Sequence, residues 1–319
     1  MNASIKFSLK PVPPFRLDLT AWALRRRPNN LIDRWDGEAY RRVLVMNGYP
    51  AEVAVRQSGP SDSPRIHVSL TSQRIVSHMK ASAKASLERL LGLQIDLSDF
   101  YRLADADLKL GVLAQRFRGL KPPRFLTIFE ALANAIACQQ MSLSLGILLL
   151  SRITETFGVA IEGTAGPAHA FPRPEDLVGL EPTAFRKLGF SYNKGRSLID
   201  LARACVEGRA NLEELTNLNN QASVQRLLEF RSVGRWSAEY VLLRGLGRLN
   251  VYSGDDVGAR NNLRSWLKLK ETVGLRRRAP CHRQMAGLRG SRLFSHVAEP
   301  PRQCRESRSE KLNKSTWSF

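Results

Sequence analysis

A short glycine turn between two helical segments constrains the fold of this chain most. The segment LLEFRSVGRWSAEYVLLRGLG, residues 227–247, has the pattern of a helix, a turn containing Ser232 and Gly234, and a second helix. Such a turn leaves backbone N–H groups exposed at the start of the second helix, where an anion such as a phosphate can bind. Arg231 and Arg235 flank it. A hairpin that only packs has the same pattern, so the segment alone leaves both interpretations open.

Two adjacent carboxylates follow the hairpin. Asp255 and Asp256 precede VGARNNLRSWL, an apparent helix, so one of them is expected to be its N-cap. The helix dipole and local N–H donors favour an ionised carboxylate there, so a cap can also serve as a catalytic anion. Trp236 and Tyr240 are four residues apart, a spacing that places both on one helix face. Such a pair is typical of a packed core and also of a pocket.

The charge of the chain indicates a polyanionic partner. The 319 residues contain 49 Lys and Arg against 29 Asp and Glu, a net charge of +20. Nucleic acid is the commonest intracellular polyanion. No apolar run reaches the roughly 20 residues that span a bilayer, and the N-terminus lacks a secretion signal. We therefore expect a protein of the cytoplasm or nucleoid that acts as a monomer without a membrane partner.

The cysteines give no sign of a metal centre. Their scattered positions have no CxxC spacing, which argues against a zinc site, a cluster or a disulfide framework. They are Cys138, Cys205, Cys281 and Cys304. We expect neither a metal nor a cofactor.

The residue pattern divides the chain into three parts. Residues 1–80 mix turn clusters with strand-like runs, which is typical of a small antiparallel sheet. Those runs are FRLDL, YRRVLVM, AEVAVRQ and RIHVSL. Helical spacing begins near residue 83, and RGLKPPRF interrupts it. We predict an N-terminal α+β domain over 1–118 and an all-helical domain over 119–270.

The segment 271–319 differs from both predicted domains. It loses apolar periodicity and gains Arg, Ser and Pro. Such a composition buries too little surface to offset the entropy of ordering. We predict a basic tail that is either disordered or the product of a displaced reading frame.

Five stretches of the sequence, in this order, resemble the helix-hairpin-helix DNA glycosylases, which excise damaged bases. The resemblance is greatest to the bacterial 3-methyladenine DNA glycosylase II branch and covers about residues 5–267. Its most specific element is VGRWSAEY followed, about 20 residues later, by a loop ending in GDD. The other stretches are FRLDLTAWALRRRPNNLIDRWDGEAYRRVL, ALANAIACQQMS, FPRPEDL and LGFSYNKGRSLIDLA. The resemblance implies a mainly α protein, with a helical core and a small antiparallel sheet domain.

The resemblance also implies roles for individual residues. Asp256 corresponds to the carboxylate that stabilises positive charge on the sugar and orients water, and Asp255 to a supporting residue. Trp236 and Tyr240 correspond to aromatics that bind a cationic alkylated purine. Positions implied to contact DNA are Gln140, Met141, Ser232, Gly234 and Arg235. Gln140 takes the place of an apolar wedge residue, and a polar loop residue is its alternative interpretation.

The implied activity is hydrolysis of alkylated purines from duplex DNA in base excision repair, with a wide substrate range. Members that also cut the backbone carry a lysine two residues after the hairpin glycine, and Trp236 stands there. No lyase activity is therefore expected. Ser232 replaces the first glycine of the usual hairpin, which is tolerable if its backbone angles stay ordinary.

The family continues after about residue 270 with helices that close the core, and the tail lacks their pattern. A catalytically impaired DNA-binding protein of the same fold is therefore the alternative. An oxidised-guanine glycosylase/lyase and a nonspecific RNA-binding protein are further alternatives.

Overall fold

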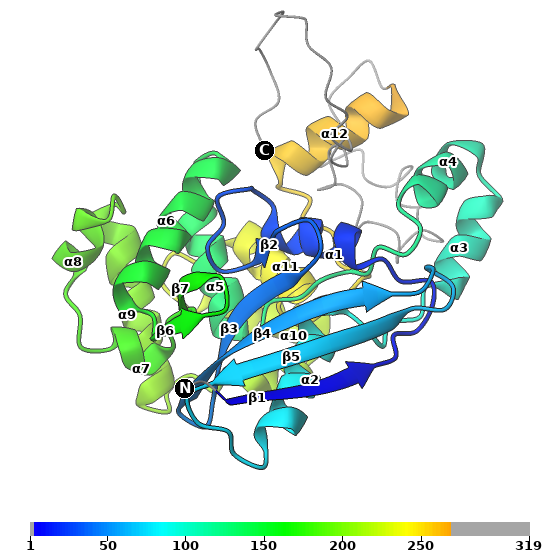
Figure 1. Cartoon of the computed structure of the whole chain (residues 1–319). Helices are drawn as coiled ribbons and strands as arrows, with labels where there is room; N and C mark the ends of the chain where they lie inside the picture. The colour runs from blue at the N-terminus through cyan, green and yellow to red at the C-terminus, as the bar shows by residue number, and fades with distance from the viewer. Residues whose placement is uncertain (1–2, 269–319) are drawn as a thin grey trace, which may run out of the picture.

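The structure is a computed structural model that describes residues 3–268. The predicted tail over 271–319 lies outside the described residues. Helices dominate the described part, with a five-stranded antiparallel sheet near the N-terminus (Figure 1). The predicted fold class, a mainly α protein with a small antiparallel sheet domain, is confirmed.

The sheet is antiparallel throughout. Its strands occur in the order β1-β5-β4-β3-β2, and neighbouring strands are antiparallel. Asn47 and Gly48 join β3 to β4 with φ of 49° and 83°, which is the two-residue turn that best matches strand twist. The bounds are β1 Ala3–Leu9, β2 Arg34–Trp35, β3 Tyr40–Met46, β4 Tyr49–Ser58 and β5 Arg65–Ser72.

One predicted strand is wrong. The run FRLDL overlaps α1 (Leu17–Arg25), a helix, and the first strand is instead β1. Leu17, Ala21 and Leu24 are buried on one face of α1, so the apolar residues follow helical spacing. The five-residue run was too short to distinguish this spacing from alternation.

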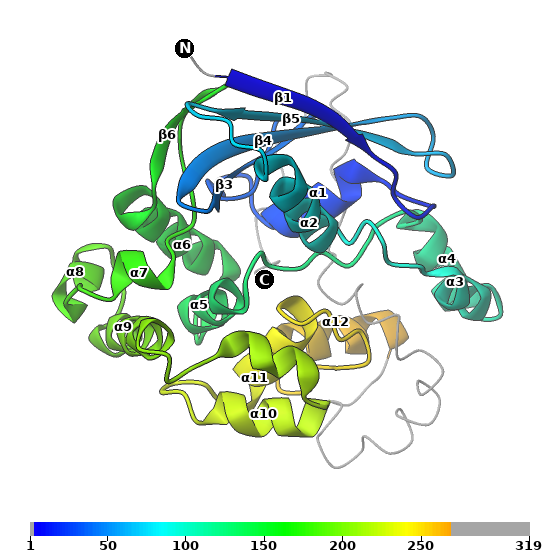
Figure 2. The same ribbon diagram turned by 90° about the horizontal axis from the view of Figure 1, so that it is seen from below.

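Four helices accompany the sheet. Figure 2 shows α1 and α2 on the face of the sheet that is turned toward the later helices, with α3 and α4 at one end. The sheet, α1 and α2 share a core that includes Tyr40, Val53 and Leu87. The bounds of the remaining three are α2 Met79–Leu91, α3 Ser98–Asp105 and α4 Leu108–Arg116.

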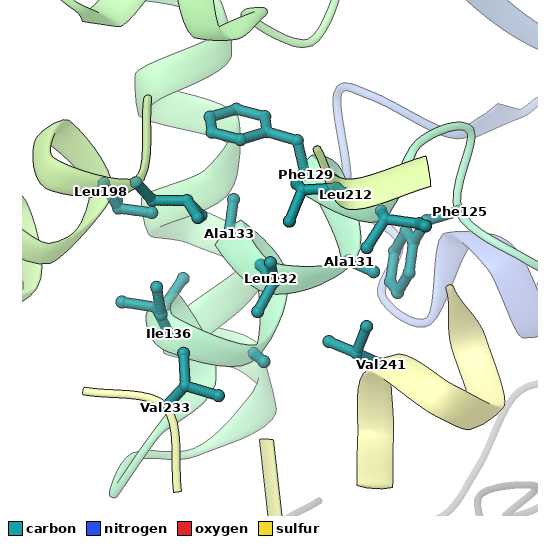
Figure 3. Packing of buried hydrophobic residues seen from close by; sticks show 14 of the residues in the cluster. Phe125, Phe129, Ala131, Leu132, Ala133, Ile136, Leu198, Leu212, Val233 and Val241 are labelled. Atoms are coloured by element: carbon teal, nitrogen blue, oxygen red, sulfur yellow. The ribbon is translucent and has the colours of Figure 1, made fainter. Parts of the chain in front are cut away.

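The later helices surround α5. Every residue from Ile128 to Ala137 is buried, and all of them except Glu130 and Asn134 are apolar, as expected for a helix at the centre of the core. Figure 3 shows Leu132 and Ile136 of α5 turned toward Val233 and Val241. The bounds are α5 Ile128–Cys138, α6 Leu143–Phe157, α7 Pro174–Leu177, α8 Pro182–Lys187, α9 Tyr192–Val206, η1 Leu212–Asn217, α10 Asn220–Leu228, α11 Arg235–Arg244 and α12 Val257–Leu267.

The prediction that the second part contains only helices is wrong. A two-stranded hairpin, β6 (Ala160–Gly163) and β7 (Gly166–His169), follows α6. The backbone N–H of Thr164 donates to Oε2 of Glu52 in β4, at 2.7 Å. The hairpin is thus hydrogen-bonded to the sheet. Its strands have only four residues each, which is too short for the sequence to predict them or their contact with a distant strand.

A buried ion triad joins the sheet to the central helix. Arg42 of β3 donates to Asp33 at 2.8 Å and to Glu130 of α5 at 2.6 Å, and all three side chains are at most 3% exposed. Buried charges of this kind are tolerated when paired and hydrogen-bonded. We retain the division near residue 118 as a proposal, because the two largest apolar clusters lie mainly on its two sides. Ile32 nevertheless belongs to the later cluster, and the triad crosses the boundary.

Candidate active site

The predicted hairpin joins α10 to α11. Gly234 is the N-cap of α11, and Ser232, Gly234 and Arg235 are exposed. The condition under which serine would be tolerated here, ordinary backbone angles, is not met, because the φ of Ser232 is 61°. That left-handed region is one that glycine adopts freely and serine does not.

Hydrogen bonds connect the hairpin to the loop between α5 and α6. Gln139 Nε2 donates to the carbonyl of Ser232 at 2.7 Å and to Ser237 Oγ at 2.9 Å. The hydroxyls of Ser232 and Ser197 are 2.7 Å apart. These bonds place Gln140, the next residue of that loop, near the hairpin.

The predicted wedge residue, Gln140, and its neighbour Met141 differ in exposure. Gln140 is exposed with φ of 53°, whereas Met141 is half-buried against the helical core. Lys194 stabilises this loop by donating from Nζ to the carbonyls of Ala137 and Gln139, at 3.0 and 2.7 Å. An exposed side chain on a loop that hydrogen bonds hold in place can enter a DNA duplex more readily than a half-buried side chain.

Trp236 and Tyr240 form a stacked pair. Their ring centroids are 5.5 Å apart with 20° between the planes, and Phe125 lies 6.0 Å from Tyr240. Trp236 is half-buried and Tyr240 buried. From the sequence, this pair could belong to a packed core or to a pocket. Because Trp236 is partly exposed, its ring is available to contact a ligand.

Asp256 lies against this pair. It is the N-cap of α12, where Oδ1 accepts from the N–H of Ala259 at 2.8 Å. Its Oδ2 accepts from Trp236 Nε1 at 3.1 Å. Among the residues described, it forms no ion pair. The prediction that one of the two aspartates caps the helix is confirmed for Asp256, while Asp255 is half-buried beside it.

The loop that carries Asp256 is fastened to α11. The N–H of Gly254 donates to Glu239 Oε2 at 3.3 Å, and the other oxygen of Glu239 accepts from Arg235 Nε at 3.0 Å. The same helix therefore carries the aromatic pair and anchors the loop of the carboxylate. Such an arrangement can hold an anion at a fixed place beside an aromatic ring.

Sequence analysis missed four residues around Tyr240. Arg26 Nη1 donates to Tyr240 Oη at 3.1 Å, and Nη2 donates to Asn134 Oδ1 at 2.5 Å. Arg244 and Phe125 complete the surroundings, with the Arg244 guanidinium 5.2 Å from the Phe125 ring. Arg26 and Tyr240 are 214 residues apart, and no local pattern reports such a contact.

Two broader searches of the described residues were negative. They hold no group of three or more His, Cys, Asp or Glu side chains that could bind a metal ion. None of the helices described is long and apolar enough to cross a membrane.

Comparisons with known proteins agree on one family. Residues 133–278 match the model described as HhH-GPD superfamily base excision DNA repair protein. DNA-3-methyladenine glycosylase of Bacillus subtilis (strain 168) is 32% identical over 166 residues, which are 52% of this chain and 55% of that protein. DNA-3-methyladenine glycosylase 2 of Escherichia coli (strain K12) is 25% identical over 251 residues, 78% of this chain and 84% of that protein.

A solved structure extends the similarity to the whole fold. The 3-methyladenine DNA glycosylase from Archaeoglobus fulgidus superposes with a TM-score of 0.75 at 26% identity, covering 92% of this chain and 96% of that one. The similarity therefore includes the N-terminal sheet, which lies outside the family-model match.

Proposed function

The chain belongs to the HhH-GPD superfamily of base excision DNA repair proteins, and from this premise we propose that it is a DNA glycosylase. Its reaction is hydrolysis of the N-glycosidic bond of alkylated purines, of the 3-methyladenine and 7-methylguanine type, in duplex DNA. The relatives named as DNA-3-methyladenine glycosylases support this substrate class.

The position of Asp256 carries the proposal. Breaking the bond between base and deoxyribose develops positive charge on the sugar, and a fixed carboxylate stabilises that charge and orients the attacking water. The N-cap bond from Ala259 and the Trp236 indole hold the Asp256 oxygens in place. Because the group is already oriented, little reorganisation opposes the reaction.

Trp236 and Tyr240 supply the binding surface for the base. An alkylated purine of this type carries positive charge and is attracted to electron-rich ring faces by about 0.5–2 kcal/mol per contact. That gain discriminates weakly between bases. A wide substrate range follows, set largely by how readily each glycosidic bond breaks.

The hairpin and the α5–α6 loop grip the DNA. Backbone N–H groups near Gly234 bind a phosphate, with Arg235 beside them. The target base must leave the stack, at an expense of a few kcal/mol, and the exposed Gln140 enters the gap next to Met141. The hydrogen bond between Gln139 and Ser232 couples these two DNA contacts.

The reaction stops at the abasic site. A lyase needs an amine that attacks the sugar, and the position two residues after Gly234 holds Trp236. The Trp236 indole is instead hydrogen-bonded to Asp256. Water is therefore the nucleophile.

Incubation with dimethyl sulfate-treated duplex DNA tests the proposal. We expect release of free methylated purines and strand breaks only after heating in base. Breaks without that treatment would support a glycosylase/lyase. DNA binding with no base release would support the catalytically impaired binding protein.

A further inference from the structure

Two guanidinium groups, that of the half-buried Arg26 and that of the buried Arg244, lie next to Tyr240 without a carboxylate partner among the described residues. The Arg26 and Arg244 guanidiniums lie 5.5 and 5.2 Å from the Phe125 ring centroid. Within the described residues, neither arginine forms an ion pair. Arg244 also buries Nε and Nη2 without a hydrogen-bond partner. Buried cations are normally paired, so this pair requires a reason other than stability.

The backbone of Arg26 has an unfavourable conformation, and its side chain reaches Tyr240. Arg26 ends α1 with φ of 58° and ψ of −36°, and a non-glycine residue rarely adopts such angles. Its two terminal nitrogens are fixed by Tyr240 and Asn134. Burial opposes its charge, but nearby acidic groups raise the pKa of Arg26 above its ordinary value. The group is therefore a fixed cation.

The contact with Arg26 leaves the Tyr240 hydroxyl able to donate. The tyrosine oxygen accepts from Arg26, so its hydrogen is not used in that bond. Burial raises the pKa of Tyr240, although Arg26 and Arg244 oppose the rise, so the hydroxyl stays protonated. A donor polarised by a guanidinium suits a carbonyl oxygen or a developing anion.

We propose that Arg26 is a specificity-determining residue that raises the release of uncharged purines bearing a carbonyl oxygen relative to that of permanently cationic alkylated purines, which the aromatic pair still binds. The inference rests on the proposed glycosylase function. It assigns the purine class from charge, because a fixed cation repels a cationic base and attracts one that becomes negative.

The charge balance of bond cleavage explains the preference. The electron pair of the C1′–N bond goes to the base, and water supplies a hydroxyl group to C1′. A cationic purine leaves neutral, and the remaining proton of the water goes to the solvent. An uncharged purine leaves as an anion and then takes that proton. Arg26 and the Tyr240 hydroxyl stabilise that anion, which the aromatic faces alone do not.

Paired rate measurements on each enzyme preparation test the proposal. One substrate is methylated duplex DNA that releases 3-methyladenine, a purine that is cationic while bonded to the sugar and has no carbonyl. The other is a duplex containing hypoxanthine, which is neutral while bonded to the sugar and has a carbonyl. The readout is the ratio of the two single-turnover rates. A partly unfolded preparation lowers both rates equally and leaves the ratio unchanged.

Arg26→Gln is expected to raise the ratio of 3-methyladenine to hypoxanthine release about 10-fold. This is the size expected for one charge roughly 10 Å away at an effective dielectric of about 20. Arg26→Lys retains the charge and should keep the ratio nearer to that of the unmodified protein. Tyr240→Phe retains the ring and should raise the ratio by slowing hypoxanthine release. Arg16→Gln removes an exposed charge at the other end of α1 and should leave the ratio unchanged.

The outcomes separate this inference from the proposed function. An unmodified protein that releases neither base contradicts the glycosylase itself. An active enzyme whose ratio stays constant in Arg26→Gln and Tyr240→Phe overturns the role of Arg26 alone. A ratio that changes equally in Arg16→Gln also overturns it, because the effect would then come from general charge.

Discussion

The Trp236 indole donates to the Asp256 carboxylate across 20 residues of sequence, with Nε1 and Oδ2 3.1 Å apart. This bond connects the surface proposed to bind the base with the group proposed to stabilise the sugar. One residue thus serves two functions, through its ring face and its N–H group.

Trp236→Phe separates these two functions. Phenylalanine keeps a ring for stacking and loses the N–H donor, and a hydrogen bond to a charged group contributes about 1.5–3 kcal/mol. We expect the single-turnover rate of base release to fall about 10-fold or more with a smaller change in DNA affinity. An unchanged rate would show that the indole bond does not orient the carboxylate.

Ser232 provides a matched test of the strained hairpin. Ser232→Ala and Ser232→Gly both lose the contact with the Ser197 hydroxyl, but only glycine relieves the left-handed φ of 61°. We expect the glycine variant to be about 1 kcal/mol more stable than the alanine variant in urea unfolding. Equal stabilities would mean that serine is not strained at this position.

We expect the Gln140 side chain to affect the rate of base release from duplex DNA and not from single-stranded DNA. Its side chain is exposed, so Gln140→Ala should leave the melting temperature unchanged. Loss of the wedge should slow base release from a duplex several-fold, because an unfilled gap makes the flipped state less favourable. The rate on single-stranded DNA provides the control, since no stacked duplex must be opened. An equal loss on both substrates would contradict the wedge role.

Lys121 gives the fold a distinctive pH dependence. Its Nζ donates to the carbonyl of Ile95 at 2.6 Å, and burial lowers its pKa from 10.5 to about 8. Between these two values the unfolded chain binds more protons than the folded one, so stability rises with pH in that window. The free energy of unfolding, measured relative to Lys121→Met, should increase from pH 8 to pH 10.5. A flat difference would contradict a lowered pKa for Lys121 in the folded protein.

The parts of the fold that local pattern controls could be predicted from the sequence. Asn47 and Gly48 mark the β3–β4 turn, and the break after Cys138 separates α5 from α6. The strand predicted for FRLDL was wrong because five residues are too few to distinguish helical spacing from alternation. The β6–β7 hairpin was missed because its strands are short and its anchor, Glu52, lies far away in sequence.

The candidate site also has one part that the sequence predicted and another that only the structure revealed. Trp236, Tyr240 and Asp256 lie within one hairpin and its following loop, so their spacing and resemblance to a family brought them together. Arg26 reaches Tyr240 from the N-terminal part, and only the three-dimensional packing of α1 reveals it. The left-handed φ of Ser232 was also hidden, because it follows from the hairpin geometry and not from serine.

The central claim is that the charge of Asp256 drives the reaction, and Asp256→Asn tests it most directly. Asparagine is an equally good N-cap, so α12 can persist while the charge is lost. Its single carbonyl oxygen cannot accept from both Ala259 and Trp236, so the bond from the indole is lost with the charge, and Trp236→Phe measures that part of the effect separately. Asp255→Asn is the matched control, since it removes the same charge one residue away.

The decisive measurement is the single-turnover rate of methylpurine release by both variants, beside their affinity for duplex DNA containing an abasic site. We predict that Asp256→Asn lowers the rate about 100-fold or more with little change in affinity, and that Asp255→Asn retains most of the rate. An Asp256→Asn protein that releases base at the unmodified rate would contradict the account.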